Sequence, residues 1–448
     1  MPEQSGGDPV EWLAAQIEEA SAAGIAATVS RLIRDGTLQP GAKLPTVREL
    51  APRLHVGPGT VSAAWRALRE QRFVEGGGRA GMRVVNTVGG PSPMRYTNIT
   101  RYWSKDTLNL SRAVPDPALL PDLGRALQHA LDDPLLHSYE VEPISESLRA
   151  AAEASWPFRA EAWMCSRGGY DGLLGLIATS VVTGETVAVE EPATPRLLDI
   201  LDHVGARVLA VPVDEQGPVP SHLAEALTHK PVAFIYEPRN SAWAGATVTA
   251  QRQAELAALL EDRDLLIIED DAWGSLSPEP YHGVGALLPE KTVFVRSYSK
   301  SHSPDLRIAV LGGAAGPVER VRVFRHFGDG WTSRILQNAL AWMLTDPASQ
   351  EAVVHAAEVY TERRQRFAAL LRERGLEVHG GDNLALWVPV RSEVQAMLVM
   401  ASHGIATIGV SSSYARRGPQ GVRVVTANHI EHLEQVADVI ALAAQAAH

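Results

Sequence analysis

Short apolar runs alternate with helix-length segments through the last three quarters of the chain, and this alternation most constrains the fold. Each run is rich in β-branched residues, as buried strands are. Parallel strands joined by helices are buried on both faces, so they form near-continuous apolar stretches in a sequence. The pattern predicts an α/β domain with a mainly parallel sheet under two helical layers. The runs are residues 187–189, 208–211, 232–236, 265–268, 293–295 and 308–311.

The stretch 292–313, TVFVRSYSKSHSPDLRIAVLGG, places two basic residues after one of these runs. Lys300 follows the predicted strand, and in open α/β sheets ligands bind beyond the carboxyl ends of strands. A lysine amine there can form a Schiff base with an aldehyde, which is the chemistry that pyridoxal phosphate uses. Arg307 carries a planar guanidinium suited to a phosphate. A strand-end lysine alone is more often a solvated surface residue, so the assignment depends on its neighbours.

A run of carboxylates follows another predicted strand. Glu269, Asp270 and Asp271 come directly after residues 265–268. Parallel strands end at one edge of a sheet, so we expect a carboxylate near Lys300, where it can pair with a protonated pyridine nitrogen. Acidic pairs also commonly cap a turn, but the strand before and the lysine after favour Asp270 as a binding residue.

A glycine-containing turn precedes a long apolar helix pattern. The sequence SRGGY leads into GLLGLIATSVV. Backbone N–H groups at a helix start point toward an anion, so Gly168, Gly169 and Tyr170 are candidates for holding a phosphate. Ser297 can add a hydroxyl to the same phosphate. Glycine pairs by themselves are common in ordinary turns.

The N-terminal region is organised differently. Residues 24–35 have helical apolar spacing, 46–54 form a short helix with Thr46 as its N-cap, and 60–71 form a second helix. The glycine-rich segment RFVEGGGRAGMRVV then alternates as a β-hairpin does. Helix, helix-turn-helix and hairpin together are the outline of a winged helix. Val61, Trp65 and Leu68 would form the apolar face of its second helix.

Charge separates this region from the rest of the chain. Residues 21–86 hold ten Lys/Arg and four Asp/Glu, a net charge of +6. Because the whole chain has a net charge of −11, the other residues together carry −17. A basic module on an acidic body predicts that only the first part meets a polyanion. We expect a winged helix over residues 21–86, a Gly- and Pro-rich linker over 87–107 and a large domain over 108–448. Tyr102 and Trp103 can dock part of the linker.

Composition excludes several classes of protein. No apolar run approaches the roughly 20 residues that cross a bilayer, and the N-terminus lacks the features of a secretory signal. Cys165 is the single cysteine, which excludes an intramolecular disulfide or a cysteine-based metal site. The 15 histidines show no metal-ligand spacing. We expect a cytoplasmic protein without a metal site or a membrane segment.

The segment LQPGAKLPTVRELAPRLHVGPGTVSAAWRALREQRFVEGGGRAGMRV resembles the GntR-type winged-helix domain over its full length. The LQPG…LPT.REL spacing is the diagnostic part. The resemblance implies binding to double-stranded operator DNA, with a small protein-binding winged helix as the alternative. Helix-start hydroxyls and arginines bind phosphates, and a wing arginine can enter the minor groove. The implied DNA-side residues are Arg48, Thr60, Ser62, Arg66 and, at the wing tip, Arg79.

The start of the recognition helix departs from this pattern. Such domains often carry an arginine where Pro58 stands and a polar residue at Gly59. Few side chains there can reach base edges, so we expect direct base readout to be thin. DNA shape or the wing would then carry more of the specificity.

The ordered motifs of the large domain resemble the type I aminotransferase fold of pyridoxal phosphate enzymes. The whole chain resembles the MocR group, in which a GntR winged helix is fused to that fold. The likeness includes PDPALLP, TGETVAVEEPATP, IIEDD, SYSK…PDLR, AAEVYTERRQRF and GVRVVTA. It implies Lys300 as the Schiff-base lysine, Asp270 as the pyridine partner and Arg423 as the residue that binds the carboxylate of an amino-acid ligand. The implied phosphate contacts are Ser297, Arg307 and the backbone around Gly168 and Gly169.

The resemblance also implies a homodimer, head-to-tail, with each winged helix packed on the other subunit. A symmetric dimer favours repeated or palindromic half-sites in DNA. Tyr139 is a candidate to reach the cofactor phosphate of the partner subunit, with a buried core tyrosine as the alternative.

Three positions depart from the group and weaken the cofactor assignment. A tyrosine that stacks on the pyridine ring is usual where Thr194 stands. Loss of that stacking weakens cofactor binding by about 0.5–1.5 kcal/mol, in addition to the loss of buried apolar area. A tyrosine that hydrogen-bonds the ring oxygen is usual where the chain has Ala272 and then Trp273. The usual H-Q-x-P-T-G stretch is here NSAWAG, with Trp243 at its centre.

Three functional hypotheses remain at this point. The first is a MocR-type regulator that binds pyridoxal phosphate at Lys300 and senses an amino acid, amine or vitamer. The second is a regulator whose degenerate domain has lost the cofactor and only dimerises or binds another ligand. The third is an active aminotransferase that its winged helix merely localises. A Trp273 or Trp243 side chain filling the ring site would favour the second hypothesis, and an open slot beside Lys300 would oppose it.

Overall fold

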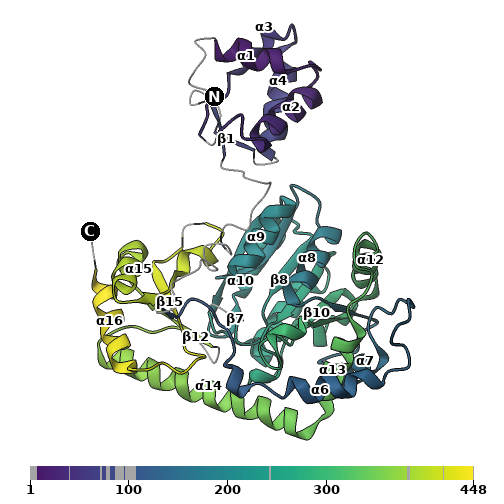
Figure 1. Ribbon diagram of the computed structural model, residues 1–448, viewed down its shortest axis with the longest axis vertical. Helices are drawn as coiled ribbons and strands as arrows, with labels where there is room; N and C mark the ends of the chain where they lie inside the picture. The colour runs from purple at the N-terminus through teal and green to yellow at the C-terminus, as the bar shows by residue number, and fades with distance from the viewer. Residues whose placement is uncertain are drawn as a thin grey trace. The chain divides into compact units, whose positions relative to one another are not determined.

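The computed structural model describes residues 8–39, 41–70, 73–76, 81–85, 95, 107–241, 244–380, 384–416 and 418–446. The chain divides into two compact units, Met1–Pro93 and Met94–His448, both drawn in Figure 1. Most of the predicted linker, including Tyr102 and Trp103, lies outside the described residues.

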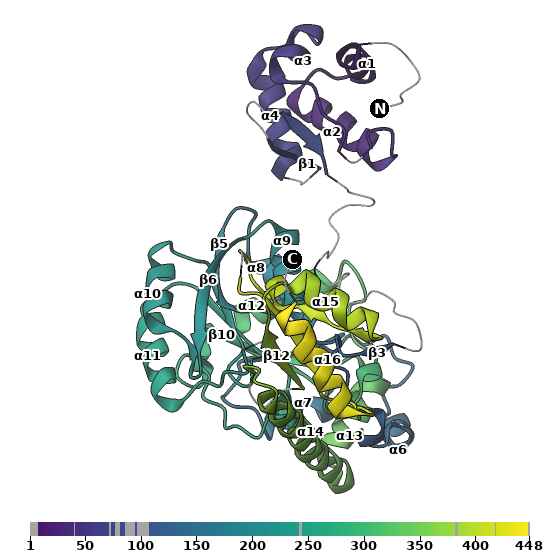
Figure 2. The same cartoon turned by 90° about the vertical axis from the view of Figure 1, so that its left-hand side faces the viewer.

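The first unit is a winged helix-turn-helix, as predicted. Val61, Trp65 and Leu68 all lie in its buried core. Its β-hairpin pairs antiparallel, and its helices can be followed in Figure 2. The first helix was not predicted. The elements are α1 (Pro9–Gln16), α2 (Ala22–Arg34), α3 (Val47–Arg53), α4 (Pro58–Glu70), β1 (Val74–Gly76) and β2 (Met82–Val84).

Local sequence determines where the helices of the helix-turn-helix begin. Thr46 caps α3 in a capping box, in which the Thr46 N–H donates to the Glu49 carboxylate at 2.7 Å. The recognition helix α4 begins at Pro58, two residues before the predicted Thr60. A proline in the first turn has a helical φ and lacks only an N–H that would have no intrahelical partner. Pro58 therefore starts the recognition helix and does not interrupt it.

The second unit is built on an eight-stranded sheet in the order β4-β11-β10-β9-β8-β5-β6-β7. The five strands from β10 to β6 are parallel to one another. The pairs β10–β11, β11–β4 and β6–β7 are antiparallel. All six predicted runs are strands of this mainly parallel sheet, whereas β4 and β7 were not predicted. The strands are β4 (Ala162–Ser166), β5 (Thr186–Glu191), β6 (Arg207–Asp214), β7 (Gly217–Pro218), β8 (Ala233–Tyr236), β9 (Leu266–Asp271), β10 (Thr292–Ser297) and β11 (Ala309–Gly313).

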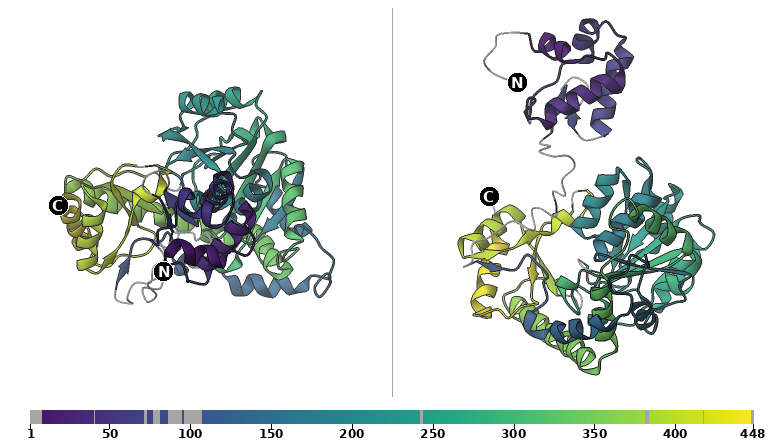
Figure 3. Two further views of the ribbon diagram at one scale, coloured as in Figure 1. Left: turned by 90° about the horizontal axis from the view of Figure 1, so that it is seen from above. Right: turned by 45° about the vertical axis from the view of Figure 1, so that its right-hand side comes forward.

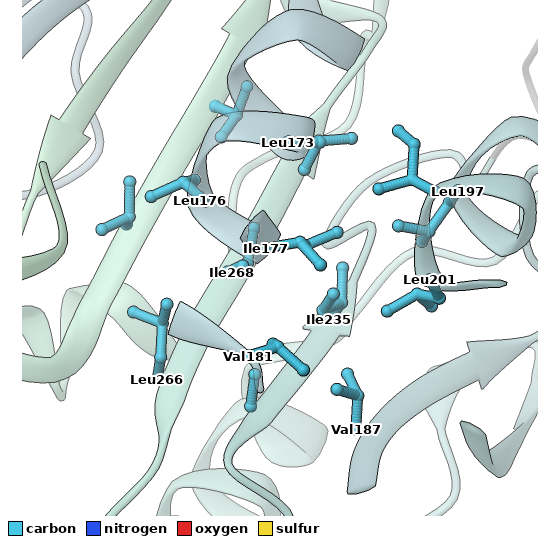
Figure 4. Close-up of a cluster of buried hydrophobic side chains, with 14 of the residues drawn as sticks. Leu173, Leu176, Ile177, Val181, Val187, Leu197, Leu201, Ile235, Leu266 and Ile268 are labelled. Atoms are coloured by element: carbon cyan, nitrogen blue, oxygen red, sulfur yellow. The ribbon is translucent and has the colours of Figure 1, made fainter. Parts of the chain in front are cut away.

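Helices cover both faces of this sheet, because successive strand residues point to opposite sides. Val187 and Val189 join one core with Leu176, whereas Ala188 between them joins the core on the other face. Figure 4 shows Val187 and Leu176 in the first of these cores. The first face is covered by α8 (Gly169–Ser180), α9 (Pro195–Val204) and α12 (Ala315–Arg325). The other face is covered by α10 (Pro220–Thr228), α11 (Ala250–Leu260), α6 (Leu123–His129), α7 (Glu146–Glu153) and α13 (Arg334–Thr345). Both layers are visible in Figure 3.

A smaller C-terminal sheet follows the long helix α14 (Pro347–Glu373). It has the order β12-β15-β14, and a separate pair joins β13 to β3 near the start of the unit. This pairing brings the segment after residue 109 to the same part of the unit as β15. The elements are β3 (Leu108–Asn109), β12 (Ala385–Pro389), α15 (Glu393–Ser402), β13 (Ile405–Ala406), β14 (Ile408–Gly409), β15 (Gly421–Val425) and α16 (Leu433–Gln445).

Among the described residues, no helix is both long enough and apolar enough to span a bilayer.

The turn after β10 contains a buried histidine. His302 is 2% exposed, its Nδ1 lies 2.8 Å from Ser301 Oγ, and its ring stands edge-on to Tyr298. Burial lowers the pKa of His302 from 6.5 to about 4, because the charged imidazole would lose its hydration. The unfolded chain therefore binds one proton more than the folded chain between these two values.

We expect the free energy of unfolding to fall as the pH drops from 6.5 toward 4, with His302 contributing about 3 kcal/mol of that loss. His302→Asn keeps a polar atom near Ser301. It should reduce the slope of the unfolding free energy against pH by up to the amount that one bound proton contributes. Urea unfolding between pH 7 and pH 4.5 measures the slope, with the exposed His429→Asn as control. An unchanged slope in His302→Asn would contradict the assignment.

Candidate ligand-binding site and nucleic-acid interface

A pocket of about 640 Å³ lies beyond the carboxyl ends of β9 and β10, beside the start of α8. In open α/β sheets this edge is where ligands bind. The pocket brings together residues that are far apart in the sequence. Gly168 adjoins it, because a Cβ at Gly168 would stand 3.1 Å from the Arg307 guanidinium. The predicted residues that line the pocket are Gly169, Tyr170, Asp270, Ser297, Lys300, Arg307 and Arg423.

Lys300 lies on the turn between β10 and β11 and is half-buried. Its Nζ is 4.7 Å from the centre of the Trp273 ring, within range of cation–π attraction. Burial lowers the pKa of the Lys300 amine, and the nearby carboxylates of Asp270 and Glu237 oppose that shift. A lysine with a lowered pKa holds a larger share of neutral amine, which is the form that attacks an aldehyde.

Asp270 lies in β9 one residue before its end and is 6% exposed. Burial raises the pKa of its carboxyl to about 7, Lys300 lowers it, and the neighbouring Asp271 raises it. A positive charge beside this carboxyl, such as a protonated ring nitrogen, would favour its ionised form, as Lys300 already does.

Asp271 fixes the end of β9. Its side chain is wholly buried, and Arg239 Nη2 and Arg296 Nε each lie 2.9 Å from its Oδ2. The Gly274 N–H donates to its Oδ1 at 3.3 Å. Because Asp271 is held on the side away from the lining, the adjacent Asp270 is the carboxylate that lines the pocket.

The start of α8 forms an anion cradle. Gly168, its N-cap, has a φ of 99° and the helix has no side-chain cap, so backbone N–H groups face outward. Arg307 reaches this turn and donates from Nη2 to the Arg167 carbonyl at 3.0 Å. Ser297 Oγ lies 3.0 Å from Ser299 Oγ, and both serines line the pocket. Backbone donors, a guanidinium and two hydroxyls are the groups that bind a phosphate.

Arg423 extends the pocket from the C-terminal sheet. It lies on β15 and is 8% exposed. Burial lowers the pKa of its guanidinium to about 10, and Tyr170 and Glu237 oppose that shift. The group is still protonated at neutral pH and offers a planar fork to a carboxylate.

The lining residues that were not assigned from the sequence include Arg112, Arg196 and Trp273. Arg112 follows β3, and its place just before the PDPALLP motif was the signal that could have identified it. Arg196 lies in the first turn of α9, and its guanidinium is 4.7 Å from the centre of the Tyr170 ring. Its position directly after a strand-to-helix turn was the corresponding signal.

The positions that depart from the family pattern are small and lie at the pocket. Thr194 and Ala272 both line it, and the Thr194 hydroxyl contacts Tyr170. Trp273 lines the pocket with its ring centre 4.7 Å from Lys300 Nζ, whereas Trp243 lies outside the described residues.

A second hollow, of about 200 Å³, lies in the first unit between α3, α4 and β2. Ser62, Arg66 and Arg69 line it and are exposed at i, i+4 and i+7, so they share one face of α4. Arg69 was not predicted, although its helical spacing from Ser62 and Arg66 identifies it. This face offers a hydroxyl and two cations to a polyanion.

The remaining predicted DNA-side residues lie outside this hollow. Arg48 is exposed on α3, and Thr60 is half-buried in the first turn of α4. Arg79, the predicted wing-tip residue, lies outside the described residues.

Two family models match the chain. Residues 21–84 match bacterial regulatory proteins of the gntR family, and residues 105–440 match aminotransferase class I and II. The second match covers more than half of the chain.

Curated relatives that are named as transcriptional regulators match most of the chain. The vitamin B6 salvage pathway transcriptional repressor PtsJ of Salmonella typhimurium is 32% identical over 367 residues, which is 81% of this chain and 83% of that protein. The HTH-type pyridoxine biosynthesis transcriptional regulator PdxR of Corynebacterium glutamicum is 27% identical over 350 residues, 75% of each chain.

Solved aminotransferases share the fold of the large unit. The multiple substrate aminotransferase of Thermococcus profundus has a TM-score of 0.71 at 17% identity and covers 80% of this chain and 95% of its own. The kynurenine aminotransferase of Pyrococcus horikoshii has a TM-score of 0.69 at 18% identity and covers 80% and 94%. Together with the winged helix, these likenesses mean that the chain belongs to the MocR-type transcriptional regulators, in which a GntR-type DNA-binding domain is fused to a class I/II aminotransferase domain.

Proposed function

We propose that this regulator binds pyridoxal phosphate covalently at Lys300 and that the bound ligand changes its affinity for operator DNA. The observation that carries the proposal is the single pocket at the strand ends that Lys300, Asp270 and Arg307 all line. We assign residues 21–86 to DNA binding, 87–107 to a linker and 108–448 to ligand binding and dimerisation.

The residues fit the cofactor group by group. The uncapped start of α8, Arg307 and Ser297 suit its phosphate, and Asp270 suits its ring nitrogen. Burial and Asp270 set the charge of the Lys300 amine that would bind its aldehyde. When bound, pyridoxal phosphate supplies an aldehyde that condenses with amines and a ring that withdraws electrons.

The vitamer itself is the signal that we favour. Two relatives are named for vitamin B6 salvage and pyridoxine biosynthesis. Five cationic side chains line the pocket, which suits a phosphate ester. They are Arg112, Arg196, Lys300, Arg307 and Arg423. An amino acid or amine whose carboxylate meets Arg423 is the second candidate, favoured by the burial of that guanidinium.

The pocket favours ligand sensing over turnover. Thr194 and Ala272 stand where a ring-stacking and a ring-oxygen phenol are usual, so the groups that tune amino transfer are missing at those positions. The pocket of about 640 Å³ that Lys300 lines favours a domain that still binds a ligand over one that has abandoned it. Amino transfer at ordinary turnover rates would contradict the preference for ligand sensing over turnover.

Wild-type protein titrated with pyridoxal phosphate should develop an absorbance band that Lys300→Ala lacks, because only the wild type offers the amine. Borohydride reduction followed by peptide mass spectrometry should place the cofactor on Lys300. We expect the affinity of Lys300→Ala to fall at least about tenfold. Lys230→Ala, which removes an exposed lysine, is the control. A band that persists in Lys300→Ala would overturn the assignment.

Arg66→Ala should weaken binding to a generic DNA duplex by about tenfold and reduce the salt slope by about one, because one phosphate contact is lost. Fluorescence anisotropy at several salt concentrations measures both quantities. Arg31→Ala, which removes an exposed arginine of α2, is the charge-matched control. Equal losses in the two variants would mean that only net charge matters and that α4 is not the DNA face.

Large exposed apolar side chains support the homodimer. Tyr139 is 89% exposed and Phe327 90%, with Phe324 and Val323 also exposed nearby in sequence. Tyr139 stands edge-on to Trp331, with ring centres 6.1 Å apart. Its exposure excludes the core-tyrosine alternative and leaves its hydroxyl free to reach a partner's phosphate. Large exposed apolar groups of this kind mark interfaces.

We expect the wild-type protein to sediment as a dimer and Phe327→Glu to dissociate at least about tenfold more readily, because a charge would be buried in the interface. Leu442→Glu, which changes a 58% exposed leucine, serves as the control. Sedimentation velocity over a concentration series measures the dissociation constant. A wild-type monomer at all concentrations would refute the dimer.

A further inference from the structure

The predicted linker is held on the large unit at Arg95. The Arg95 Nη1 lies 2.6 Å from Asp202 Oδ2 and 3.3 Å from Asp199 Oδ1. The Arg95 backbone N–H also donates to Asp199 Oδ1 at 3.3 Å. Both aspartates lie on α9, three residues apart, so they share one face of that helix. We call this set of contacts the Arg95 clasp.

The clasp differs from an ordinary surface ion pair. The Asp199 side chain is only 6% exposed, and those of Arg95 and Asp202 are mostly covered. Burial would lower the pKa of the Arg95 guanidinium, but Asp202 and Asp199 raise it by more. Charge-assisted hydrogen bonds of this kind are stronger than those between neutral groups. Because the backbone N–H takes part as well, the clasp fixes the chain at Arg95 and not only its side chain.

The clasp shortens the connection between the two units. The described part of the winged helix ends at Val85, and residues 86–94 separate it from Arg95. The chain is held on the large unit a second time where the Leu108 N–H donates to the Gly404 carbonyl at 2.8 Å. With the clasp formed, the connection consists of residues 86–94. With the clasp broken, it extends to residue 107.

The helix that carries the clasp begins in the ligand pocket. Thr194, the N-cap of α9, and Arg196 in its first turn both line the pocket. Leu197 and Leu201 of the same helix are buried in the core beside the sheet (Figure 4). Six residues of helix separate Arg196 from the second aspartate of the clasp, a rise of about 9 Å. A single packed helix therefore joins the pocket to the linker.

Charge connects the pocket residue with the clasp. Arg196 and Asp199 stand three positions apart on α9, so they are neighbours on the helix surface. Arg196 and Arg95 are thus two cations that one carboxylate attracts, and they repel each other. An anion bound in the pocket beside Arg196 would neutralise its charge and leave Asp199 more strongly paired with Arg95. Anion binding and formation of the clasp therefore favour each other.

We propose that the Arg95 clasp is the regulatory contact through which an anionic ligand in the pocket sets the length of the connection to the winged helix. The ligand is pyridoxal phosphate, on the premise of the proposed function. Ligand binding strengthens the clasp and shortens the connection, and ligand loss weakens the clasp and lengthens it. Linker length sets the effective concentration of one winged helix at DNA that its partner already holds. The DNA affinity of the dimer consequently follows the ligand.

Trypsin cleavage tests the clasp directly. Trypsin cuts after arginine and must take the arginine side chain into its own pocket, so cleavage after Arg95 requires a broken clasp. We expect Asp202→Asn to accelerate this cleavage about tenfold, because the population of the broken clasp rises. Pyridoxal phosphate should slow it about three- to tenfold in the wild type. Peptide mass spectrometry over time measures cleavage at this bond.

A matched variant and a DNA-binding measurement complete the test. Asp262→Asn neutralises an exposed aspartate and should leave the cleavage rate unchanged. Asp202 does not line the pocket, so Asp202→Asn should keep the Lys300-dependent absorbance band. The ratio of dissociation constants for a generic DNA duplex of several helical turns, measured with and without pyridoxal phosphate, should move at least about threefold toward one in Asp202→Asn. Thermal unfolding shows whether either variant alters the fold.

Equal cleavage after Arg95 in the wild type and Asp202→Asn would overturn the clasp. A wild type that binds pyridoxal phosphate at Lys300 but is cleaved equally with and without it would overturn the ligand control and leave the proposed cofactor binding intact. An unchanged ratio of DNA dissociation constants in Asp202→Asn would also overturn that control. A wild type without Lys300-dependent binding would overturn the proposed function and the ligand control together, whereas cleavage would still decide the clasp.

Discussion

The buried ion pairs of Asp271 are the constraint on which the pocket depends. Asp271 ends β9, Arg239 follows β8, and Arg296 lies on β10. One carboxylate therefore ties together the carboxyl ends of three neighbouring parallel strands. Removing one member of such a group costs about 3–5 kcal/mol, because the others stay buried without compensation. The Asp271 ion pairs fix the position of Asp270 before them in the chain and of the turn at Trp273 after them.

Charge around the pocket is arranged so that the lining stays positive. Arginines and Lys300 line the cavity, while Glu190 at β5 and Glu237 after β8 are buried near it. Burial and the nearby Glu237 raise the pKa of Glu190 well above its usual value. This shift disfavours the charged form of Glu190, so the carboxyl groups beneath the pocket oppose its positive potential less strongly. This balance suits an anionic ligand better than a neutral amine.

The sequence predicted the sheet and the centre of the site for the same reason. Buried parallel strands are continuous apolar runs, and Asp270 and Lys300 follow such runs directly, so their meeting at one sheet edge follows from topology. Arg112 reaches the pocket through the β3–β13 pairing, and Arg196 reaches it from the start of α9. Local sequence patterns do not encode these tertiary placements. From the sequence, Trp273 was identified only as a side chain that could fill the ring site and as the neighbour of Ala272, where a tyrosine is usual.

A regulator and an enzyme need different chemical groups in the same pocket. An enzyme needs groups that move protons as the reaction proceeds, whereas a sensor needs a ligand held in one state and released when its concentration falls. The pocket retains the groups that hold, namely Lys300, Arg307 and Asp270, and the phenols usual at positions 194 and 272 are replaced by threonine and alanine. The attraction between Trp273 and the free Lys300 ammonium favours release, because it stabilises the ligand-free lysine. These features fit the ligand-responsive switch on the aminotransferase fold that we propose.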